Sequence, residues 1–483
     1  MKISELQPKI VFHYFEELSK IPHGSGNTKR ITEYCLDFAK EHGLKSYSDE
    51  TGNVVIYKDG TKGYENSEPI IIQGHLDMVC DKTDDCDIDM SKESIRIICD
   101  GEYITADGTT LGGDDGIAVA FVLALLSSDD IPHPPIEALL TTDEEIGMIG
   151  ANNLDSSCLK GKRLINIDSE EEGILTTSCA GGVRASCELP MKYIASDPQT
   201  DCFYALSVNG LRSGHSGIDI NKHRKNAIKV LGRLLEFVNR RCEIHICNIK
   251  GGGKENVIPK SASTTIAVNI DSKELLIKAV NDFSSMIKEE ISSVEPDVSV
   301  TAIENDACEC YADVDSTRKL IFALMQIPNG IQAMNPDMPD MVQTSLNLGT
   351  AYTDDKSLIL KYLVRSNAAT GKQEIVEKLV SFIEYLGGKI EFASNYPAWE
   401  YRANSPLRDI MISAYKDCYA DAPVVQSIHA GLECGILSAK IPGADMISFG
   451  PDIESVHTPD ERLGIASVGR SWNYLLEVLK RLK

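Results

Sequence analysis

The stretch Ile70–Val79, IIIQGHLDMV, constrains the fold of this 483-residue chain more than any other. Three consecutive β-branched residues predict a strand that is covered on both faces, as in the sheets of α/β proteins. A buried strand that ends in a histidine and an aspartate needs polar partners at that end, because unpaired polar groups are costly to bury. A single histidine in this position is more often a core or turn residue than a ligand, so the rest of the chain has to decide the role of His75.

The N-terminal part of the chain alternates short apolar runs with helical patterns. The runs NVVIYK, PIIIQGHLD, GIAVAFVLALLSS, PIEALLTTDEE and KRLINIDSEE predict strand, strand, helix, strand and strand. This order is typical of α/β layers around a largely buried sheet. The longest apolar run, IAVAFVLALL at 117–126, fits a buried helix, since a membrane span needs about 20 residues.

From about Ser186 the pattern changes to strands followed by long amphipathic helices. The segments LILKYLVRSN and KQEIVEKLVSFIEYLGG resemble the earlier STTIAVNI and the helix from Ser272, which hints at an internal duplication. The tail is too short to fold alone and is expected to return to the first domain. The predicted boundaries are therefore 1–184 and 399–483 for one domain and 185–398 for an insertion.

Composition excludes several classes of partner. The chain has 48 Lys plus Arg against 72 Asp plus Glu, a formal charge of −24. This charge repels phosphate backbones and anionic lipid surfaces, so we expect neither nucleic acid nor membrane as a partner. The start of the chain lacks a signal-peptide core, and the 14 cysteines form no CxxC pair. We expect reduced thiols in a cytoplasmic protein, with Cys308 and Cys310 more typical of a loop than of a metal site.

Polar residues follow four successive elements of the first predicted domain. In open α/β sheets, ligands gather outside the carboxyl ends of the strands. Several carboxylates in one crevice repel each other unless a cation lies among them. The sequence therefore predicts a site for a divalent metal, with two ions expected. The residues concerned are His75, Asp77, Asp114, Asp115, Asp143, Glu144, Glu145 and Asp168.

Each stretch also has a simpler interpretation. The glycine-flanked turn LGGDDG can present Asp114 to a metal, but Asp114 or Asp115 can equally cap the helix that follows. Glu144 and Glu145 cannot point the same way, so one can ligate a metal while the other takes a proton from water. The alternative for this pair is a solvated acidic run. His457 lies in a Gly/Pro-rich loop, where it can supply the second imidazole of a two-metal site.

Five motifs in this order, GHLDMV, GGDDG, TTDEEIGMIGA, NIDSEE and SVHTPDERL, resemble the M20 family of co-catalytic metallopeptidases. Within that family they are similar to the aminoacyl-histidine dipeptidase (peptidase D, Xaa-His dipeptidase) branch. The resemblance covers essentially the whole chain, including GLRSGHSGIDI, GGGKENVIP and HAGLECGIL. It implies an α/β fold: a mixed-sheet, two-metal exopeptidase catalytic domain with an inserted α+β lid domain.

The resemblance also implies roles for residues of the first domain. Asp114 bridges two divalent metals, expected to be zinc with cobalt or manganese as alternatives. Asp77 orients a ligand histidine, which the two-residue spacing also allows, and Glu144 is the general base. The presence of Asp115, where several relatives have Asn, leaves open which aspartate of the turn is the bridge. The implied metal ligands are His75, Asp114, Asp168, Glu145 and His457.

Four further residues are assigned to the substrate by the same resemblance. His215 polarises the scissile carbonyl and Asn256 assists it, while Arg365 and Gly435 hold the terminal carboxylate. His215 can alternatively be a helix-start residue, and Arg365 can form an ion pair on a strand face.

The function expected from the resemblance is that of a cytoplasmic dipeptidase of the M20 type. Its substrates would be unblocked Xaa-His dipeptides, including β-alanyl-histidine, with broad specificity, and a metal-bound water activated by Glu144 would cleave them. A second copy of the chain is the one macromolecular partner that we consider, in a homodimer. The alternatives are an N-acyl amino acid deacylase, a tripeptidase and a non-enzymatic metal-binding scaffold. The presence of both Glu144 and Glu145 argues against the scaffold, because a protein that only binds metal has no need of an uncoordinated base.

Overall fold

A computed structural model describes residues 2–197, 199–336 and 338–483. The chain divides into two compact units. Unit 1 comprises Met1–Cys179, Tyr401–Ser427 and Leu432–Lys483, and unit 2 comprises Ala180–Glu400 and Ile428–Gly431. The main boundaries thus lie a few residues from those expected at 184/185 and 398/399. The short return of the chain into unit 2 was not anticipated.

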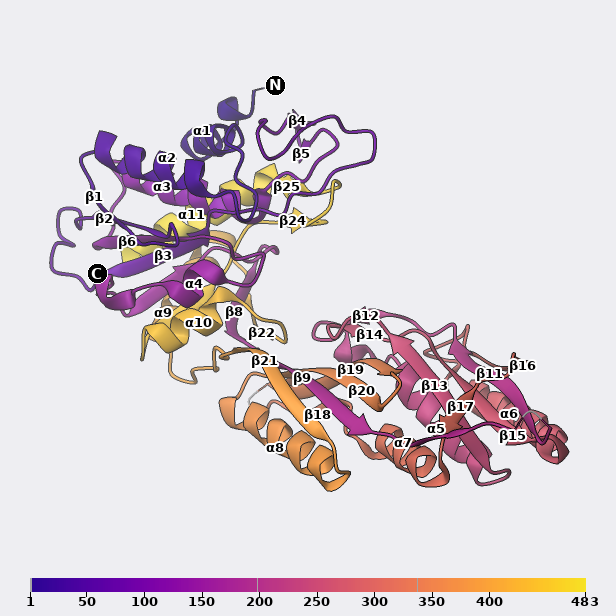
Figure 1. Cartoon of the computed structure of the whole chain (residues 1–483). Coiled ribbons are helices and arrows are strands. Elements are labelled where there is room, and N and C mark those ends of the chain that lie inside the picture. The colour runs from indigo at the N-terminus through magenta and orange to yellow at the C-terminus, as the bar shows by residue number, and fades with distance from the viewer. Residues whose placement is uncertain (1, 198, 337) are drawn as a thin grey trace. The chain divides into compact units, whose positions relative to one another are not determined.

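Unit 1 is built on an eight-stranded mixed sheet with the order β1-β2-β6-β3-β7-β23-β8-β22 (Figure 1). Its central strands β6, β3, β7 and β23 are parallel to one another, so their carboxyl ends meet at one edge. The strands are β1 Lys45–Ser48, β2 Val54–Lys58, β3 Ile70–His75, β6 Ile136–Thr141, β7 Arg163–Asn166, β8 Ile174–Cys179, β22 Val424–Ile428 and β23 Asp445–Ser448.

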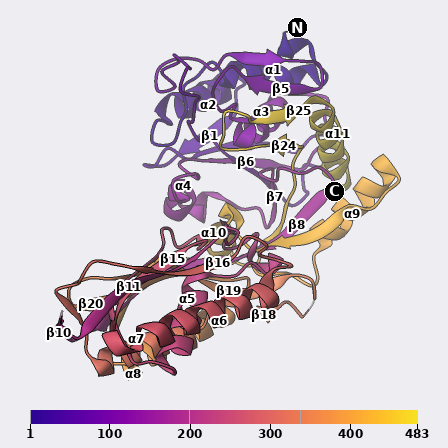
Figure 2. The same cartoon turned by 90° about the vertical axis from the view of Figure 1, so that its right-hand side faces the viewer.

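Helices cover both faces of this sheet. On one face lie α1 Lys9–Leu18, α2 Lys29–Glu41, α3 Gly113–Ser127, α9 Pro406–Tyr419 and α11 Ile465–Arg481, with α9 beside α11 in Figure 2. The short α4 Ile149–Asn153 and α10 Glu433–Lys440 lie on the other. Ile70 and Ile72 join the core under the first group, whereas Ile71 points to the opposite face, and all three are fully buried. The expected strand covered on both faces is confirmed.

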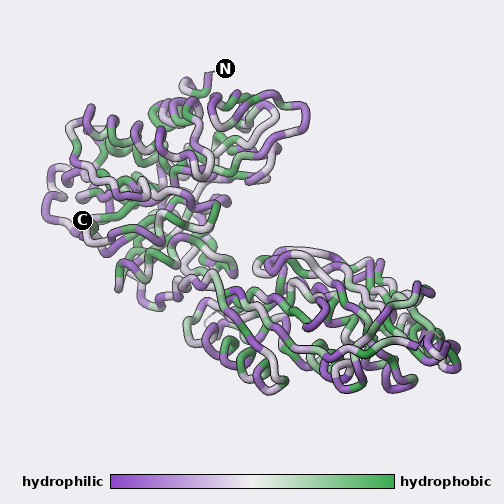
Figure 3. Tube along the Cα trace, viewed as in Figure 1, coloured by the Kyte–Doolittle hydropathy of each residue, from purple (hydrophilic) through white to green (hydrophobic). Residues whose placement is uncertain are grey.

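A small four-stranded sheet completes unit 1, with the order β24-β25-β5-β4. Its strands are β4 Ile97–Cys99, β5 Tyr103–Ala106, β24 Ile453–Glu454 and β25 Arg462–Gly464. The hydropathy colouring of Figure 3 is mostly green, hydrophobic, along α3 and the central strands of unit 1. Among the described residues, no helix is both long and apolar enough to cross a bilayer.

Unit 2 has an antiparallel sheet with the order β16-β11-β15-β13-β19-β20-β9-β21, and β18 also pairs with β19. Two small pairs, β10–β17 and β12–β14, lie beside it. Helices α5 Ala227–Asn239, α6 Lys273–Ile291, α7 Val314–Gln326 and α8 Ala369–Tyr385 pack on the sheet through one hydrophobic core. The strands are β9 Gly181–Pro190, β10 Tyr193–Ala195, β11 Asp201–Asn209, β12 Gly214–His215, β13 Ile244–Gly252, β14 Val257–Ile258, β15 Ala262–Asn269, β16 Ser299–Glu304, β17 Cys310–Ala312, β18 Gly330–Met334, β19 Val342–Thr353, β20 Ser357–Ser366 and β21 Lys389–Tyr396.

The two halves of this sheet share one topology. In the first half, β11, α5, β13, β15, α6 and β16 give the strand order 4-1-3-2, and in the second half β9, α7, β19, β20, α8 and β21 give the same order. This is the β-α-β-β-α-β arrangement of ferredoxin-like folds. The segments STTIAVNI and LILKYLVRSN are both third strands of their halves. Because β9 precedes the first half in the chain, the repeat is nested rather than tandem.

Candidate metal centre

The carboxyl end of β3 presents His75 to a group of carboxylates. The imidazole is buried, with Nδ1 2.9 Å from the backbone carbonyl oxygen of Asp77. An Nδ1–H that donates to this carbonyl leaves Nε2 facing the carboxylates. Nε2 lies 3.1 Å from Oδ1 of Asp114 and 3.7 Å from Oδ1 of Asp168. The polar end of this buried strand therefore has partners from two other elements.

Asp114 lies between two imidazoles at the start of α3. Its Oδ1 faces His75, and its Oδ2 is 3.2 Å from Nε2 of His457. The neighbouring Asp115 is turned toward β3, where its Oδ2 accepts the backbone N–H of His75 at 3.0 Å. Asp115 also offers an oxygen within 4.8 Å of ligand atoms of His75 and Asp168. Only Asp114 of the two, however, has one oxygen near His75 and the other near His457.

The loop that follows β6 brings Glu145 to the same group. Its Oε1 lies 2.8 Å from Nε2 of His457, which comes from the distant loop before β25. One ligand atom each from His75, Asp114 and Glu145 lies within 4.8 Å of the others. All five side chains expected as metal ligands are thus linked by contacts within unit 1.

Glu144 differs from its neighbour. None of the described residues donates a hydrogen bond to its carboxylate, while its backbone N–H donates to Oδ1 of Asp77 at 2.9 Å. Oδ2 of Asp77 accepts the hydroxyl of Ser25 at 2.8 Å and the N–H of Glu145 at 3.3 Å. The carboxylate of Asp77 is 3.5 Å from Nδ1 of His75, farther than its own carbonyl oxygen. The carboxylate of Asp77 therefore holds the loop that carries the two glutamates through two backbone N–H groups.

The crowded charges change the protonation of this group. Burial raises the pKa of Asp168 to about 6 and that of Glu144 well above its usual range. Hydrogen bonds with Asp114 and Glu145 raise the pKa of His457 to about 11. Burial opposes charge on His75, yet the hydrogen bonds that it donates to carboxylates, to Asp114 first, raise its pKa well above its ordinary value. Two imidazoles among several carboxylates form a nitrogen and oxygen donor set of the kind that suits a divalent cation.

In unit 2, His215 lies in β12. This strand pairs with β14, which begins at the residue after Asn256. The carbonyl oxygen of Asn256 accepts the N–H of Ser216 at 2.8 Å. Nδ1 of His215 accepts the backbone N–H groups of Gly217 and Ile218 at 3.3 and 3.2 Å. The neutral ring therefore carries its hydrogen on Nε2. The alternative that His215 starts a helix is wrong.

Nε2 of His215 is 3.2 Å from Nη2 of Arg365 on β20. Both atoms are donors, so this pair needs a shared acceptor from elsewhere. Arg365 is 5% exposed and its Nη1 donates to the hydroxyl of Tyr396. No carboxylate of the described residues pairs with Arg365, so the alternative of a strand-face ion pair is wrong. Burial lowers the pKa of His215, with Arg365 acting the same way.

Comparison with known proteins bears on this geometry. The pattern of the peptidase family M20/M25/M40 matches residues 71–481. The chain belongs to this peptidase family. It is therefore a hydrolase that acts on peptide bonds, with the fold class expected from its motifs.

Two relatives are similar over their whole length. The cytosol non-specific dipeptidase of Escherichia coli K12 is 37% identical over 483 residues, which cover 100% of this chain and 99% of the relative. A crystal structure of aminoacylhistidine dipeptidase from Vibrio alginolyticus is 36% identical with a TM-score of 0.95, covering 99% and 98% of the two chains. A Staphylococcus aureus tripeptidase structure, 17% identical with a TM-score of 0.56 over 99% of both chains, shares the fold.

The sequence analysis of this M20 chain did not predict a row of buried, hydrogen-bonded polar side chains beneath the metal centre. Gln73 donates to Glu433 and accepts from Asn166, both at 2.6 Å, and Thr141 donates to Glu433 at 2.6 Å. Gln73 stands two positions before His75 in β3 and so points to the same face of that strand. Thr141 and Asn166 are the last residues of β6 and β7, two positions before Asp143 and Asp168. That spacing was the available signal. Glu433 begins α10, whose first turn also contains the predicted substrate residue Gly435.

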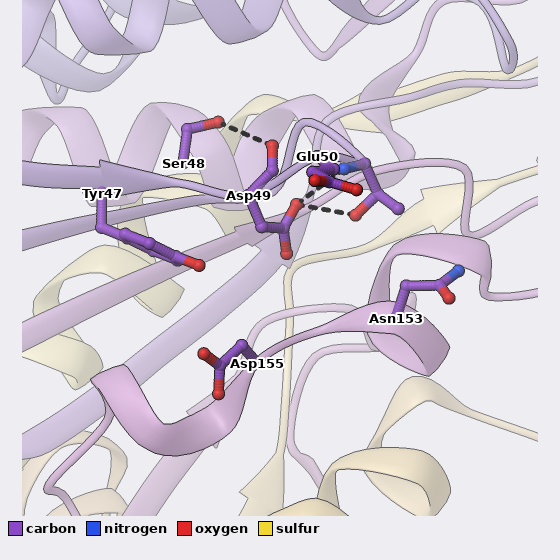
Figure 4. A pocket seen from close by; sticks show the side chains of 7 residues that line it. Tyr47, Ser48, Asp49, Glu50, Asn153 and Asp155 are labelled. Atoms are coloured by element: carbon purple, nitrogen blue, oxygen red, sulfur yellow. Dashed lines mark hydrogen bonds between the residues drawn. The ribbon is translucent and has the colours of Figure 1, made fainter.

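The hollow drawn in Figure 4 lies elsewhere in unit 1. Its volume is about 610 Å³. The carboxylate of Asp49 accepts hydrogen bonds from the side chains of Thr51 and Asn53, both at 2.7 Å. The lining contains none of the residues predicted for metal, catalysis or substrate; it consists of Tyr47, Ser48, Asp49, Glu50, Thr51, Asn153 and Asp155.

Proposed function

We propose that the chain is a metal-dependent dipeptidase that hydrolyses unblocked dipeptides of the Xaa-His type, including β-alanyl-histidine, with broad specificity. The observation that carries the proposal is the carboxylate of Glu144, which accepts no hydrogen bond from the described residues, beside the linked cluster of His75, Asp114 and Glu145. The names of the two full-length relatives support a dipeptidase. We also propose a cytoplasmic location, as in the name of the Escherichia coli relative, and a homodimer.

The cluster is proposed to hold two divalent cations, with zinc expected and cobalt or manganese as alternatives. Asp114, whose two oxygens face different imidazoles, would be the ligand that the two cations share. His75 and Asp168 complete one site, and Glu145 and His457 complete the other. Bound cations of this kind lower the pKa of a water and polarise a carbonyl group.

Glu144 is the proposed general base. It takes a proton from the attacking water and delivers it to the leaving amine, a task for a carboxylate whose pKa lies near the working pH. Asp77 fixes the backbone of Glu144 and so sets where the carboxylate can reach. It also holds His75 through its carbonyl oxygen.

The donor pair of unit 2 is proposed to receive oxygen atoms of the substrate. Nε2–H of His215 suits the developing negative charge on the scissile carbonyl, with Asn256 assisting. Arg365, which pairs with no carboxylate of the described residues, suits the terminal carboxylate of the substrate, the role that the family resemblance also gives to Gly435. The acidic residues around the cluster favour a substrate with a free amine.

A substrate panel at equal metal content tests this function. It compares β-alanyl-histidine, other dipeptides, a tripeptide and N-acetyl-histidine, with the wild type and Glu144→Gln. We expect turnover of the free dipeptides, and a loss of at least about 100-fold in Glu144→Gln, in keeping with general acid–base contributions, while both cations remain bound. Cleavage of N-acetyl-histidine but not of dipeptides would establish the deacylase, and preference for the tripeptide would establish the tripeptidase. Normal turnover by the variant would refute the base.

A further inference from the structure

Glu461 places a buried carboxylate against four successive backbone N–H groups of the LGGD turn. Oε2 accepts from Leu111 at 2.8 Å and Gly112 at 3.1 Å, and Oε1 accepts from Gly113 at 2.7 Å and Asp114 at 3.3 Å. The side chain of Glu461 is 2% exposed. Consecutive amides that converge in this way form an anion-binding nest.

The double glycine makes this approach possible. Gly112 has a φ of +72°, a left-handed conformation that turns the following amides inward. A Cβ on Gly113 would lie 3.2 Å from Oε1 of Glu461, tighter than usual side-chain packing. The carboxylate of Asp114 faces the two imidazoles, and that of Asp115 accepts the N–H of His75. Neither caps the helix within the described part of the chain, so the alternative of an aspartate cap is wrong.

Glu461 also belongs to the loop that carries His457. It lies four residues after that histidine, and its N–H donates to the carbonyl of Thr458 at 3.1 Å. Its carboxylate thus joins this loop to the turn of Asp114. Oδ2 of Asp114 is 3.2 Å from Nε2 of His457, so Glu461 holds the turn of one partner in this contact and lies in the loop of the other.

We propose that Glu461 is a positioning residue of the metal centre, which sets the separation of Asp114 and His457 and thereby the affinity of the cation that they share. The inference rests on the proposed two-metal function. Glu461 touches neither substrate nor cation in this account; it acts through the two ligands that it joins. Replacing one oxygen by the amide of glutamine would turn a donor toward two backbone donors and shift the turn.

Glu461→Gln would lower the stability of the protein even if Glu461 had a purely structural role. The test therefore needs a control variant that loses the same kind of contact elsewhere. Glu137 is another buried carboxylate of unit 1, at the other end of β6, and it accepts the N–H groups of Lys160 at 2.9 Å and Gly161 at 3.0 Å. Glu137→Gln breaks the same kind of contact away from the ligands. We expect both variants to lose thermal stability, and only Glu461→Gln to lose metal affinity.

The test is calorimetric titration of metal-stripped protein with Zn²⁺, repeated with Co²⁺ to follow its visible spectrum. We expect Glu461→Gln to bind one of two cations about 10- to 100-fold more weakly, the usual effect of removing such a support. Gly113→Ala should shift the affinity in the same direction by a smaller factor, and it replaces Glu461→Gln if that variant does not fold.

The possible outcomes are separable. Two unchanged affinities in Glu461→Gln, or an equal loss in Glu137→Gln, would overturn the positioning role while leaving the two-metal site intact. A wild-type protein that binds no cation would overturn the proposed function and this inference with it. An altered Co²⁺ spectrum in Glu461→Gln alone would support the proposal.

Discussion

Asp77 holds Glu144 by its backbone and not by its side chain: Oδ1 of Asp77 accepts the N–H of Glu144 at 2.9 Å. The proposed base is therefore fixed at its Cα while its carboxylate stays free to exchange protons. Burial and the neighbouring acidic groups raise its pKa. An aspartate expected to orient an imidazole thus also controls the position of the base.

Asp77→Asn should lower kcat, because an amide cannot accept from Ser25, Glu144 and Glu145 with both of its polar atoms. We expect a loss of about 10- to 100-fold with metal content nearly unchanged. Steady-state kinetics and metal analysis of the same preparation measure both quantities. Ser25→Ala, which removes one contact to Asp77, is the milder control. Loss of both cations in Asp77→Asn would instead place its main effect on His75.

Arg365→Lys should raise KM for free dipeptides, because an ammonium group cannot form the paired contacts of a guanidinium with a carboxylate. A charged hydrogen bond contributes about 1.5–3 kcal/mol, so KM should rise by about 10- to 100-fold. Dipeptide amides, which lack the carboxylate, should show a much smaller change. Arg184→Lys, at a half-exposed arginine of the neighbouring strand β9, should leave KM unchanged. An equal effect on acids and amides would refute the carboxylate role.

The residues of the metal cluster could be predicted because strand periodicity places them at the ends of parallel strands. His75 follows three buried isoleucines, and Asp168 follows the buried β7, so both had to emerge at one edge of the sheet. His457 was placed by the resemblance and by its loop composition. In each case the signal was local in the sequence.

The supporting contacts could not be predicted because they join distant segments. Glu461 reaches Leu111 and Gly113 across the fold, and a glutamate after a Gly/Pro-rich loop is typical of the surface. Likewise, an aspartate before a helix usually caps it, and only the structure shows that Asp114 faces two imidazoles and Asp115 the backbone of His75. The nested repeat of unit 2 was hidden because its first strand, β9, lies far ahead of the rest in the chain.

Gly74→Ala should destabilise unit 1. An added Cβ would lie 2.6 Å from Cβ of Ala118 and 2.7 Å from Oδ2 of Asp115, so α3 and β3 would have to separate. Overpacking of this kind costs about 1–3 kcal/mol. Gly116→Ala, in the same helix, meets only an ordinary contact of 3.4 Å with Phe15 and should change the unfolding free energy by less than about 1 kcal/mol. Urea denaturation of the metal-free proteins compares the two, and equal stabilities would contradict the close approach of α3 to β3.

Glu433→Gln should change how stability depends on pH. Burial raises the pKa of Glu433 to about 7, against an ordinary value of 4.5. A carboxyl whose folded pKa is raised favours folding below its unfolded pKa, and this advantage is lost as the pH rises through the folded value. Glutamine cannot ionise and can keep its oxygen toward Gln73 and Thr141, because Oε1 of Glu433 has no hydrogen-bond partner among the described residues. The metal-free variant should therefore gain on the wild type between pH 4.5 and 7, by on the order of 2 kcal/mol. Denaturation at pH 5 and pH 8 checks this, and a parallel pH dependence of the two proteins would show that Glu433 stays ionised in the folded chain.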